Sequence, residues 1–156
     1  MSIEVVLPGL QTTIQDHGRY GCRHMGIPQS GAADLFSYKL ANFLLGQLPN
    51  ATVLECTLTG PSLRFLSNMQ IMISGADMQP EVNGSAIDMF APCRVQAGDE
   101  LIMHACLVGC RSYIAFSKDL VCDSFMGSSS TYLPAKLGGL NGKALASGDV
   151  VATTGD

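Results

Sequence analysis

The stretch 52-TVLECTLTGPSLRFL-66 decides the fold expected for this chain, because alternating residues are followed by a turn and a second apolar run. Successive side chains of a strand point to opposite faces. The two faces would carry Leu54, Cys56 and Leu58 on one side and Val53, Glu55 and Thr57 on the other. Gly60 and Pro61 then turn the chain. The pattern predicts strand structure that is interrupted by a turn.

Short apolar runs of the same kind recur along the chain, at residues 3–7, 69–75, 81–87, 97–105 and 111–117. Seventeen glycines and seven prolines separate them, which favours many short strands over long helices. Asn83 and Gly84 both tolerate positive φ and predict a two-residue hairpin turn. Gly98 and Asp99 suit a tight turn into the next strand. We therefore expect a mainly β fold.

One segment breaks this pattern and predicts a helix over about residues 31–45. Its apolar residues recur at helical spacing, at Phe36, Leu40, Phe43 and Leu44. Ser30 can cap the start of the helix, and Gly46 can end it. The helix is expected to cover one face of a sheet or to plug the open end of a barrel.

Length and composition limit the class of protein. The 156 residues fit a single domain, with 47% hydrophobic and 14% charged residues, and no apolar run reaches the roughly 18 residues of a membrane span. Nine basic against thirteen acidic residues give a net charge of −4, which argues against nucleic-acid partners. No secretory signal is visible at the start, so we expect a soluble cytoplasmic protein whose six cysteines are free thiols.

Polar chemistry concentrates in 15-QDHGRYGCRHMGIPQSGAAD-34, the loop before the predicted helix. Asp16, Arg19, Arg23 and Asp34 predict a corner that binds an anion or a carboxyl group, with arginine as a fixed fork and helix amides as donors. The same residues also fit a simpler hypothesis, an ion-pair and turn network that holds a glycine-rich connection in shape. The sequence leaves both interpretations open.

Three further motifs contain residue types that could carry chemistry. The run 126-MGSSST-131, with Ser130 and Thr131, predicts either a phosphate or carboxylate cradle or a polar turn. The spacing of His104, Cys106 and Cys110 does not make a convincing zinc site, so no metal is expected. Lys39 lacks the methionine neighbours of a biotin-carrying lysine, so covalent biotin is not expected.

The order of the motifs resembles a known family. The segments PGLQTTIQDHGRYGCRHMGIPQSGAAD, LECTLTGPSLRF, ISGAD, AGDEL, GCRSYIAF, MGSSST and GGLNGKAL occur in the order seen in the carboxyltransferase-domain family. That family includes the C subunit of 5-oxoprolinase, allophanate hydrolase subunit 2 and the carboxyltransferase region of urea carboxylase. The resemblance runs nearly end to end and matches the N-terminal half of family members, which are about twice as long.

The resemblance implies a cyclophilin-like β-barrel and a place in a heteromeric hydrolase. It suggests one subunit of an ATP-dependent 5-oxoprolinase, which opens 5-oxoproline to glutamate together with its A and B subunits, with ATP as co-substrate. Asp16, Arg19 and Arg23 are then the candidate catalytic residues. Candidate substrate- or nucleotide-binding residues are Ser30, Asp34, Arg111, Ser130 and Thr131.

Two other functions stay open at this point. One is a subunit of a urea carboxylase or allophanate hydrolase, and the other is a non-catalytic regulatory protein that only recruits a B-subunit partner. In each case the isolated chain is expected to be folded but inactive. Because 47% of its residues are hydrophobic, it is also expected to expose an apolar surface for a partner.

Overall fold

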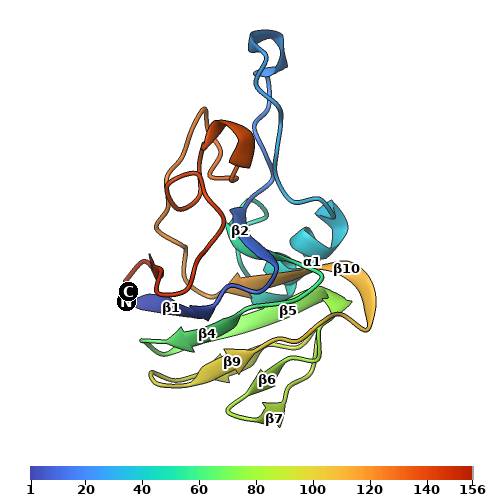
Figure 1. Ribbon diagram of the computed structural model, residues 1–156, viewed down its shortest axis with the longest axis vertical. Coiled ribbons are helices and arrows are strands. Elements are labelled where there is room, and N and C mark those ends of the chain that lie inside the picture. The colour runs from blue at the N-terminus through green and yellow to red at the C-terminus, as the bar shows by residue number, and fades with distance from the viewer. Residues whose placement is uncertain (156) are drawn as a thin grey trace.

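A computed structural model describes residues 1–155 and shows a mainly β protein built from two antiparallel sheets (Figure 1). The first sheet has the order β11 (Val150–Ala152), β1 (Ser2–Leu7), β4 (Ser62–Phe65), β9 (Glu100–Ile102), β6 (Glu81–Val82) and β7 (Ser85–Ala86). The second has the order β2 (Gln11–Gln15), β3 (Val53–Thr57), β10 (Val108–Phe116), β5 (Met69–Asp77) and β8 (Cys93–Val95). The mainly β class with one long helix is confirmed, but the two sheets do not close into a barrel.

Residues 52–66 form β3 and β4, as the alternation of their side chains predicts. Leu54 and Cys56 point into the main hydrophobic core, and Val53 points to the opposite side, against a second apolar cluster. The expectation for Leu58 is wrong, because it adopts a left-handed backbone (φ 59°) and is 43% exposed. The strand therefore ends at Thr57.

The predicted turns are confirmed at both places. Asn83 (φ 51°) and Gly84 (φ 78°) connect β6 to β7, and Gly98 (φ 95°) lies in the turn before β9. The sequence pattern did not reveal three of the strands, namely β2, β8 and β11. Two of them have only three residues, and β2 reads as polar although most of its side chains are buried.

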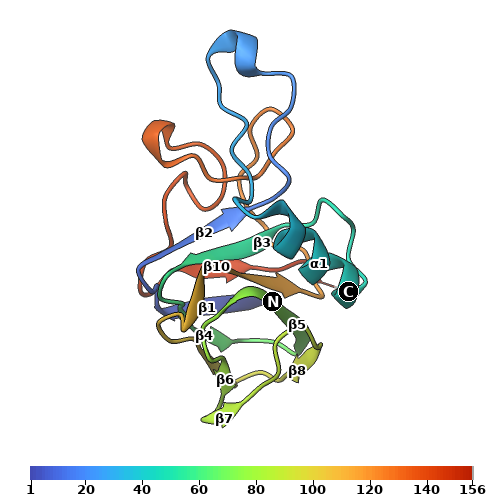
Figure 2. The same cartoon turned by 90° about the vertical axis from the view of Figure 1, so that its right-hand side faces the viewer.

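Helix α1 (Leu35–Leu45) packs across the second sheet, against β5 and β10 (Figure 2). It ends at Gly46 (φ 74°) as expected. Its predicted start is wrong: the carboxylate of Asp34, and not the hydroxyl of Ser30, accepts hydrogen bonds from the first helical amides, those of Phe36 and Ser37. Ser30 lies four residues before the cap in a left-handed conformation (φ 55°).

The two phenylalanines of the apolar stripe that predicted the helix do not face the sheet. Phe36 is 75% exposed and Phe43 is 77% exposed, so the apolar stripe faces outward. The residues that face the sheet are Ser37, Tyr38, Ala41 and Asn42. Within residues 1–155, no helix is long and apolar enough to cross a membrane.

Two long connections rise from one end of the sheets, at the top of Figure 1. The first is the hairpin formed by residues 16–34, whose tip carries the 3-10 helix η1 (Arg23–Met25). The second runs through residues 117–149 and contains the 3-10 helix η2 (Leu133–Ala135). Hydrogen bonds join the two, so residues far apart in sequence form one polar region above the sheets.

Candidate functional site

The structure places the predicted site residues in three locations. The base of the hairpin brings together Asp16, Arg19, Ser130 and Thr131. Asp34 and Arg111 line the same cavity beside α1. Arg23 is exposed at the tip of the hairpin, and Ser30 returns along its other arm.

Asp16 links the hairpin to the second connection. Its Oδ1 accepts hydrogen bonds from the backbone N–H of Gly18 (2.8 Å) and the hydroxyl of Ser128 (2.6 Å). Its Oδ2 accepts one from the backbone N–H of Ser129 (2.7 Å). The side chain is buried, so both oxygens are engaged inside the protein. This geometry is that of the turn network that the sequence also allows, and a catalytic role for Asp16 stays a prediction.

Arg19 makes a second link between the two connections, although it is only 1% exposed. Its Nε donates to the carbonyl of Phe125 (3.0 Å), and its Nη2 donates to the carbonyl of Ser130. Burial lowers the pKa of Arg19, and the nearby charge of Asp16 opposes that shift. Arg19 is therefore a buried cation with a carboxylate nearby.

Ser130 and Thr131 use their hydroxyls within this base. The Ser130 hydroxyl is hydrogen-bonded to that of Ser128 (2.6 Å), and the Thr131 hydroxyl donates to the carbonyl of Ile14 (2.8 Å). Ser130 is 0% exposed and Thr131 is 5% exposed. These contacts hold the second connection against β2, and a part in ligand binding stays a prediction for both residues.

The Arg111 side chain is positioned by an irregularity in β10. The pairing of β10 with β5 shifts register between Val108 and Ser112, a feature that often re-aims side chains beside functional sites. Gly75 (φ 86°) faces this shift, and a Cβ there would lie 2.5 Å from the carbonyl oxygen of Arg111. Only glycine allows the two backbones to come this close.

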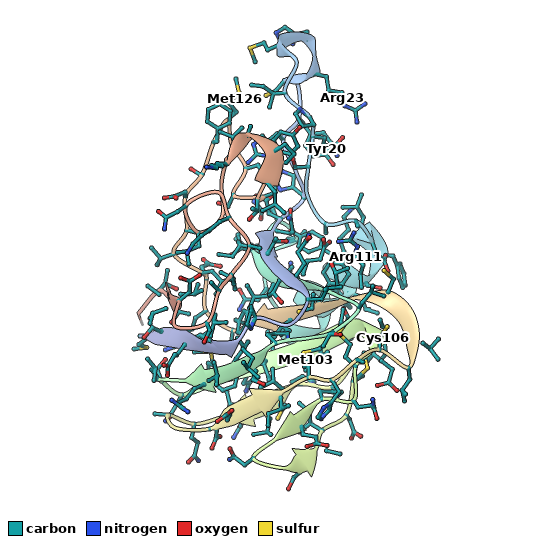
Figure 3. The ribbon with its side chains drawn as sticks, in the orientation of Figure 1. Tyr20, Arg23, Met103, Cys106, Arg111 and Met126 are labelled. Atoms are coloured by element: carbon teal, nitrogen blue, oxygen red, sulfur yellow. The ribbon has the colours of Figure 1, made fainter. Side chains whose placement is uncertain are left out.

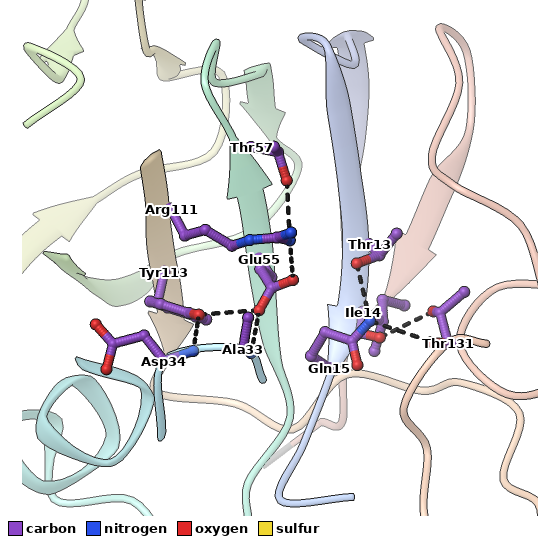
Figure 4. A network of polar contacts seen from close by, with 10 residues as sticks. All are labelled: Thr13, Ile14, Gln15, Ala33, Asp34, Glu55, Thr57, Arg111, Tyr113 and Thr131. Atoms are coloured by element: carbon purple, nitrogen blue, oxygen red, sulfur yellow. Dashed lines mark hydrogen bonds and ion pairs between the residues drawn. The ribbon is translucent and has the colours of Figure 1, made fainter. Parts of the chain in front are cut away.

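A buried carboxylate holds the Arg111 guanidinium in place (Figure 4). Nη1 of Arg111 lies 2.7 Å from Oε1 of Glu55 and donates to the hydroxyl of Thr57 (3.1 Å). The Glu55 side chain is 5% exposed, whereas that of Arg111 is 34% exposed. The ion pair therefore has one buried and one accessible partner.

The second oxygen of Glu55 organises the start of the helix. Oε2 accepts hydrogen bonds from the backbone N–H of Ala33 (2.8 Å) and the hydroxyl of Tyr113 (2.9 Å), and that hydroxyl accepts one from the backbone N–H of Asp34 (2.8 Å). Burial raises the pKa of Tyr113, so it stays a neutral donor. The hydrogen bond from the Ser37 hydroxyl lowers the pKa of Asp34, which stays ionised.

A cavity of about 410 Å³ opens beside this network. The residues that line it include Arg111, Asp34, Phe90 and Cys110. A fixed guanidinium beside a small cavity can bind a carbonyl oxygen or an oxyanion and stabilise negative charge there. We call this place the Arg111 groove.

Glu55 and Tyr113 are site residues that the sequence analysis missed. Glu55 gave one usable signal, because it is the single charged residue in the strand VLECT. Tyr113 gave none, because an aromatic residue is ordinary in a strand. Within residues 1–155, no group of three His, Cys, Asp or Glu side chains has an arrangement that could hold a metal ion.

Both the sequence and the fold of this chain match those of carboxyltransferase-type domains. The profile described as "Carboxyltransferase domain, subdomain A and B" matches residues 25–156. The chain belongs to this family.

Similar proteins fall into two groups. The chain is 38% identical over 151 residues to urea amidolyase of Lachancea kluyveri, covering 96% of this chain and 8% of that protein. It is 33% identical over 147 residues to the 5-oxoprolinase C subunit of Escherichia coli, covering 94% of this chain and 47% of that protein. The crystal structure of the K. lactis urea amidolyase superposes with a TM-score of 0.96 at 36% identity, covering 97% of this chain and 9% of that one. The chain thus spans about half of the bacterial relative and a small part of urea amidolyase.

Proposed function

We propose that this chain is part of an ATP-dependent 5-oxoprolinase, which opens the lactam of 5-oxoproline to glutamate. The observation that carries the proposal is the similarity to the 5-oxoprolinase C subunit of two bacteria, Escherichia coli and Haemophilus influenzae, along 94% of the chain. In this proposal, homologues of the A and B subunits are the partners, ATP is the co-substrate of the complex, and this chain carries no covalent biotin.

The Arg111 groove is the proposed place for the amide group. A lactam carbonyl is poorly reactive, so its hydrolysis requires positioning and stabilisation of the negative charge that develops on oxygen. Arg111 supplies the accessible donor, and Glu55 fixes its orientation through their 2.7 Å ion pair. Asp34 lines the same cavity and provides a charged acceptor for a substrate N–H.

A urea carboxylase function is the second candidate, and one specific observation favours it. The identity to urea amidolyase, 38%, is higher than the 33% to the 5-oxoprolinase C subunit. Urea also presents an unreactive carbonyl between nitrogen atoms, so the Arg111 groove suits it for the same reason. A non-catalytic role in recruiting a B-subunit homologue is the third candidate.

Reconstitution separates these candidates. The protein is purified together with homologues of the A and B subunits, and glutamate release from 5-oxoproline is measured with and without ATP. In parallel, urea and bicarbonate are supplied with a biotin-carrying partner, and urea-dependent ATP hydrolysis is measured. ATP-dependent glutamate release supports the first proposal, and urea-dependent turnover supports the second. A stable complex without either activity contradicts both.

The role of the groove is tested with Arg111→Lys, which keeps a positive charge beside Glu55 but loses the planar fork. Turnover is expected to fall roughly 10-fold or more, because a lysine cannot reproduce the geometry of the guanidinium donors. Arg94→Gln, a change at an exposed position of β8, is the matched control and should leave turnover unchanged. Equal turnover for both variants would remove Arg111 from the site.

A further inference from the structure

Unpartnered buried polar atoms concentrate in one short part of the chain. Within residues 1–155, seven buried side-chain nitrogen or oxygen atoms have no hydrogen-bond partner, and four of them belong to residues 15–30. These four atoms are Gln15 Oε1, His17 Nδ1, Arg19 Nη1 and Ser30 Oγ. Native proteins leave few such groups, so each of these atoms calls for a partner that the described residues do not supply.

Arg19 is the most informative of these four residues, because it is both charged and 1% exposed. Two of its three nitrogens donate to backbone carbonyls, whereas Nη1 has no acceptor among the described residues. The nearby carboxylate of Asp16 is already engaged by one hydroxyl and two backbone amides. A buried cation is costly unless its donors are satisfied, so an added anion would be favourable here.

A cavity of about 380 Å³ lies at this point of the hairpin. Figure 3 labels two of its residues, Tyr20 and Arg23, on the hairpin. Its lining residues are Arg19, Tyr20, Gly21, Arg23, His24 and Gln29. Two arginines and a histidine face it without an acidic residue, although the chain as a whole carries a net charge of −4. The residues that line the cavity are therefore basic or neutral. We call this place the hairpin cavity.

Gln29 holds Arg23, the second cation of the hairpin cavity, in place. Nη2 of Arg23 donates to the side-chain oxygen of Gln29 (2.9 Å) across the hairpin, which leaves other N–H groups of this exposed guanidinium available. The ring of Tyr20 stacks on that of His17, with 5.5 Å between their centroids, and so limits the movement of the wall. One buried arginine, Arg19, and one exposed arginine, Arg23, thus line the cavity.

We propose that the hairpin cavity binds the oxyanion group, carboxylate or phosphate, of a small ligand. Arg19 supplies a fixed charge with an unpartnered N–H, and Arg23 supplies exposed donors. This site is separate from the Arg111 groove, which other residues line. It does not rest on the proposed function, because binding to it can be measured without turnover.

The test is a binding titration of the ¹⁵N-labelled protein, followed through the Arg19 Nε–H signal and the backbone amides of residues 19–29. The probes are inorganic phosphate and 5-oxoproline, and 2-pyrrolidone serves as the matched probe that lacks the carboxylate. Saturable shifts with a Kd on the order of 1 mM or tighter are expected for at least one of the two anions. Saturation by phosphate alone or by 5-oxoproline alone identifies the source of the oxyanion.

Two variants locate the binding. Arg23→Gln changes an exposed side chain, so the protein is expected to remain folded while the affinity for the anion falls roughly 10-fold. Arg94→Gln removes an exposed positive charge on β8 and should leave the affinity unchanged. The proposal is overturned if neither anion saturates the signals, if 2-pyrrolidone shifts them equally, or if the two variants weaken binding to the same extent.

Discussion

At the scale of the residue, a single buried polar side chain can connect several elements of this fold through its hydrogen bonds. Glu55 is the clearest case, because its carboxylate is buried and accepts hydrogen bonds from Arg111, Tyr113 and the backbone of Ala33. A buried carboxylate is tolerated when its acceptors are used in this way. The residue therefore links β3, β10 and the segment that enters α1.

Replacing Glu55 by glutamine is expected to lower the free energy of unfolding by roughly 2 kcal/mol, because Arg111 loses its anion and one donor then faces another. Urea denaturation measures this change. Glu4→Gln is the control, since Glu4 pairs with Arg64 at 3.0 Å but the two side chains are 33% and 43% exposed. Exposed pairs contribute less than about 1 kcal/mol. A larger loss for Glu4→Gln than for Glu55→Gln would contradict the importance of the buried network.

At the scale of the element, the side chains of α1 that are buried are the ones that fit the polar surface of the sheet, and not the most hydrophobic ones. The sheet beneath it and the loop that follows it offer polar partners: the Ser74 hydroxyl donates to the carbonyl of Ser37 (2.7 Å), and Tyr38 and Asn42 donate to the carbonyl of Ala51. Small and polar residues therefore face the sheet closely. The phenylalanines are left on the outside, as an exposed apolar surface of the predicted kind.

Because of this orientation, replacing a large apolar residue of α1 is expected to affect stability less than enlarging a small one. Phe43→Ser should change the free energy of unfolding by no more than about 0.5 kcal/mol, because the ring is 77% exposed. Ala41→Leu, on the buried face at 0% exposure, should cost about 1–3 kcal/mol through overpacking. Thermal and urea unfolding compare them directly. A large loss for Phe43→Ser with none for Ala41→Leu would mean that the helix is rotated.

The cap of α1 predicts a pH dependence on the acid side. The folded pKa of Asp34 lies below its ordinary value, mainly because of the hydrogen bond from Ser37, so the unfolded chain binds its proton more readily. The contribution of Asp34 to stability is therefore complete above the ordinary pKa of 3.8 and is lost as the pH falls below it. Asp34→Asn keeps a capping side chain but cannot titrate.

Unfolding free energies measured between about pH 6 and about pH 3 should fall less steeply for Asp34→Asn than for the unmodified protein, because one acid-sensitive contribution is gone. Asp88→Asn, at an exposed acidic residue, is the control and should retain the steeper fall. Parallel curves for the unmodified protein and Asp34→Asn would show that the cap makes no acid-dependent contribution.

At the scale of the whole molecule, the hairpin and the second connection depend on each other. Asp16 reaches Ser128, which is 112 positions away, and Arg19 reaches Ser130, which is 111 positions away. Neither connection has extensive regular structure, so these buried contacts fix their conformations. The polar region above the sheets, with the hairpin cavity, exists only when both are in place.

Asp16→Asn is expected to loosen both connections together, because the amide cannot accept both the Ser128 hydroxyl and the Ser129 N–H with the strength of a carboxylate. Limited proteolysis should then cut within residues 123–141 and within the hairpin sooner than in the unmodified protein. Asp123→Asn is the control, since Asp123 is exposed and its side chain accepts a hydrogen bond from the backbone of Asn141 (3.0 Å). Unchanged cleavage for Asp16→Asn would show that the two connections are independent.

The sequence alone determined the local features of this fold, namely strand alternation, turns and the end of the helix. The alternation around Leu54 and Cys56, the Asn83–Gly84 turn and the end of α1 at Gly46 were predictable from sequence. Each depends on residues a few positions apart, whose side-chain direction or backbone freedom is fixed by covalent geometry. The mainly β class with a single long helix follows from the same signals.

The tertiary structure decided what local patterns leave open. The sequence predicted Ser30 as the cap of α1, whereas in the folded chain the carboxylate of Asp34 caps the helix. Packing of α1 against β5 and β10 left its phenylalanines outward. Glu55 and Arg111 are 56 positions apart, and their pairing required β3 and β10 to be neighbours in register. Contacts of this kind depend on which surfaces meet after the chain has folded. Residue spacing along the sequence does not predict them.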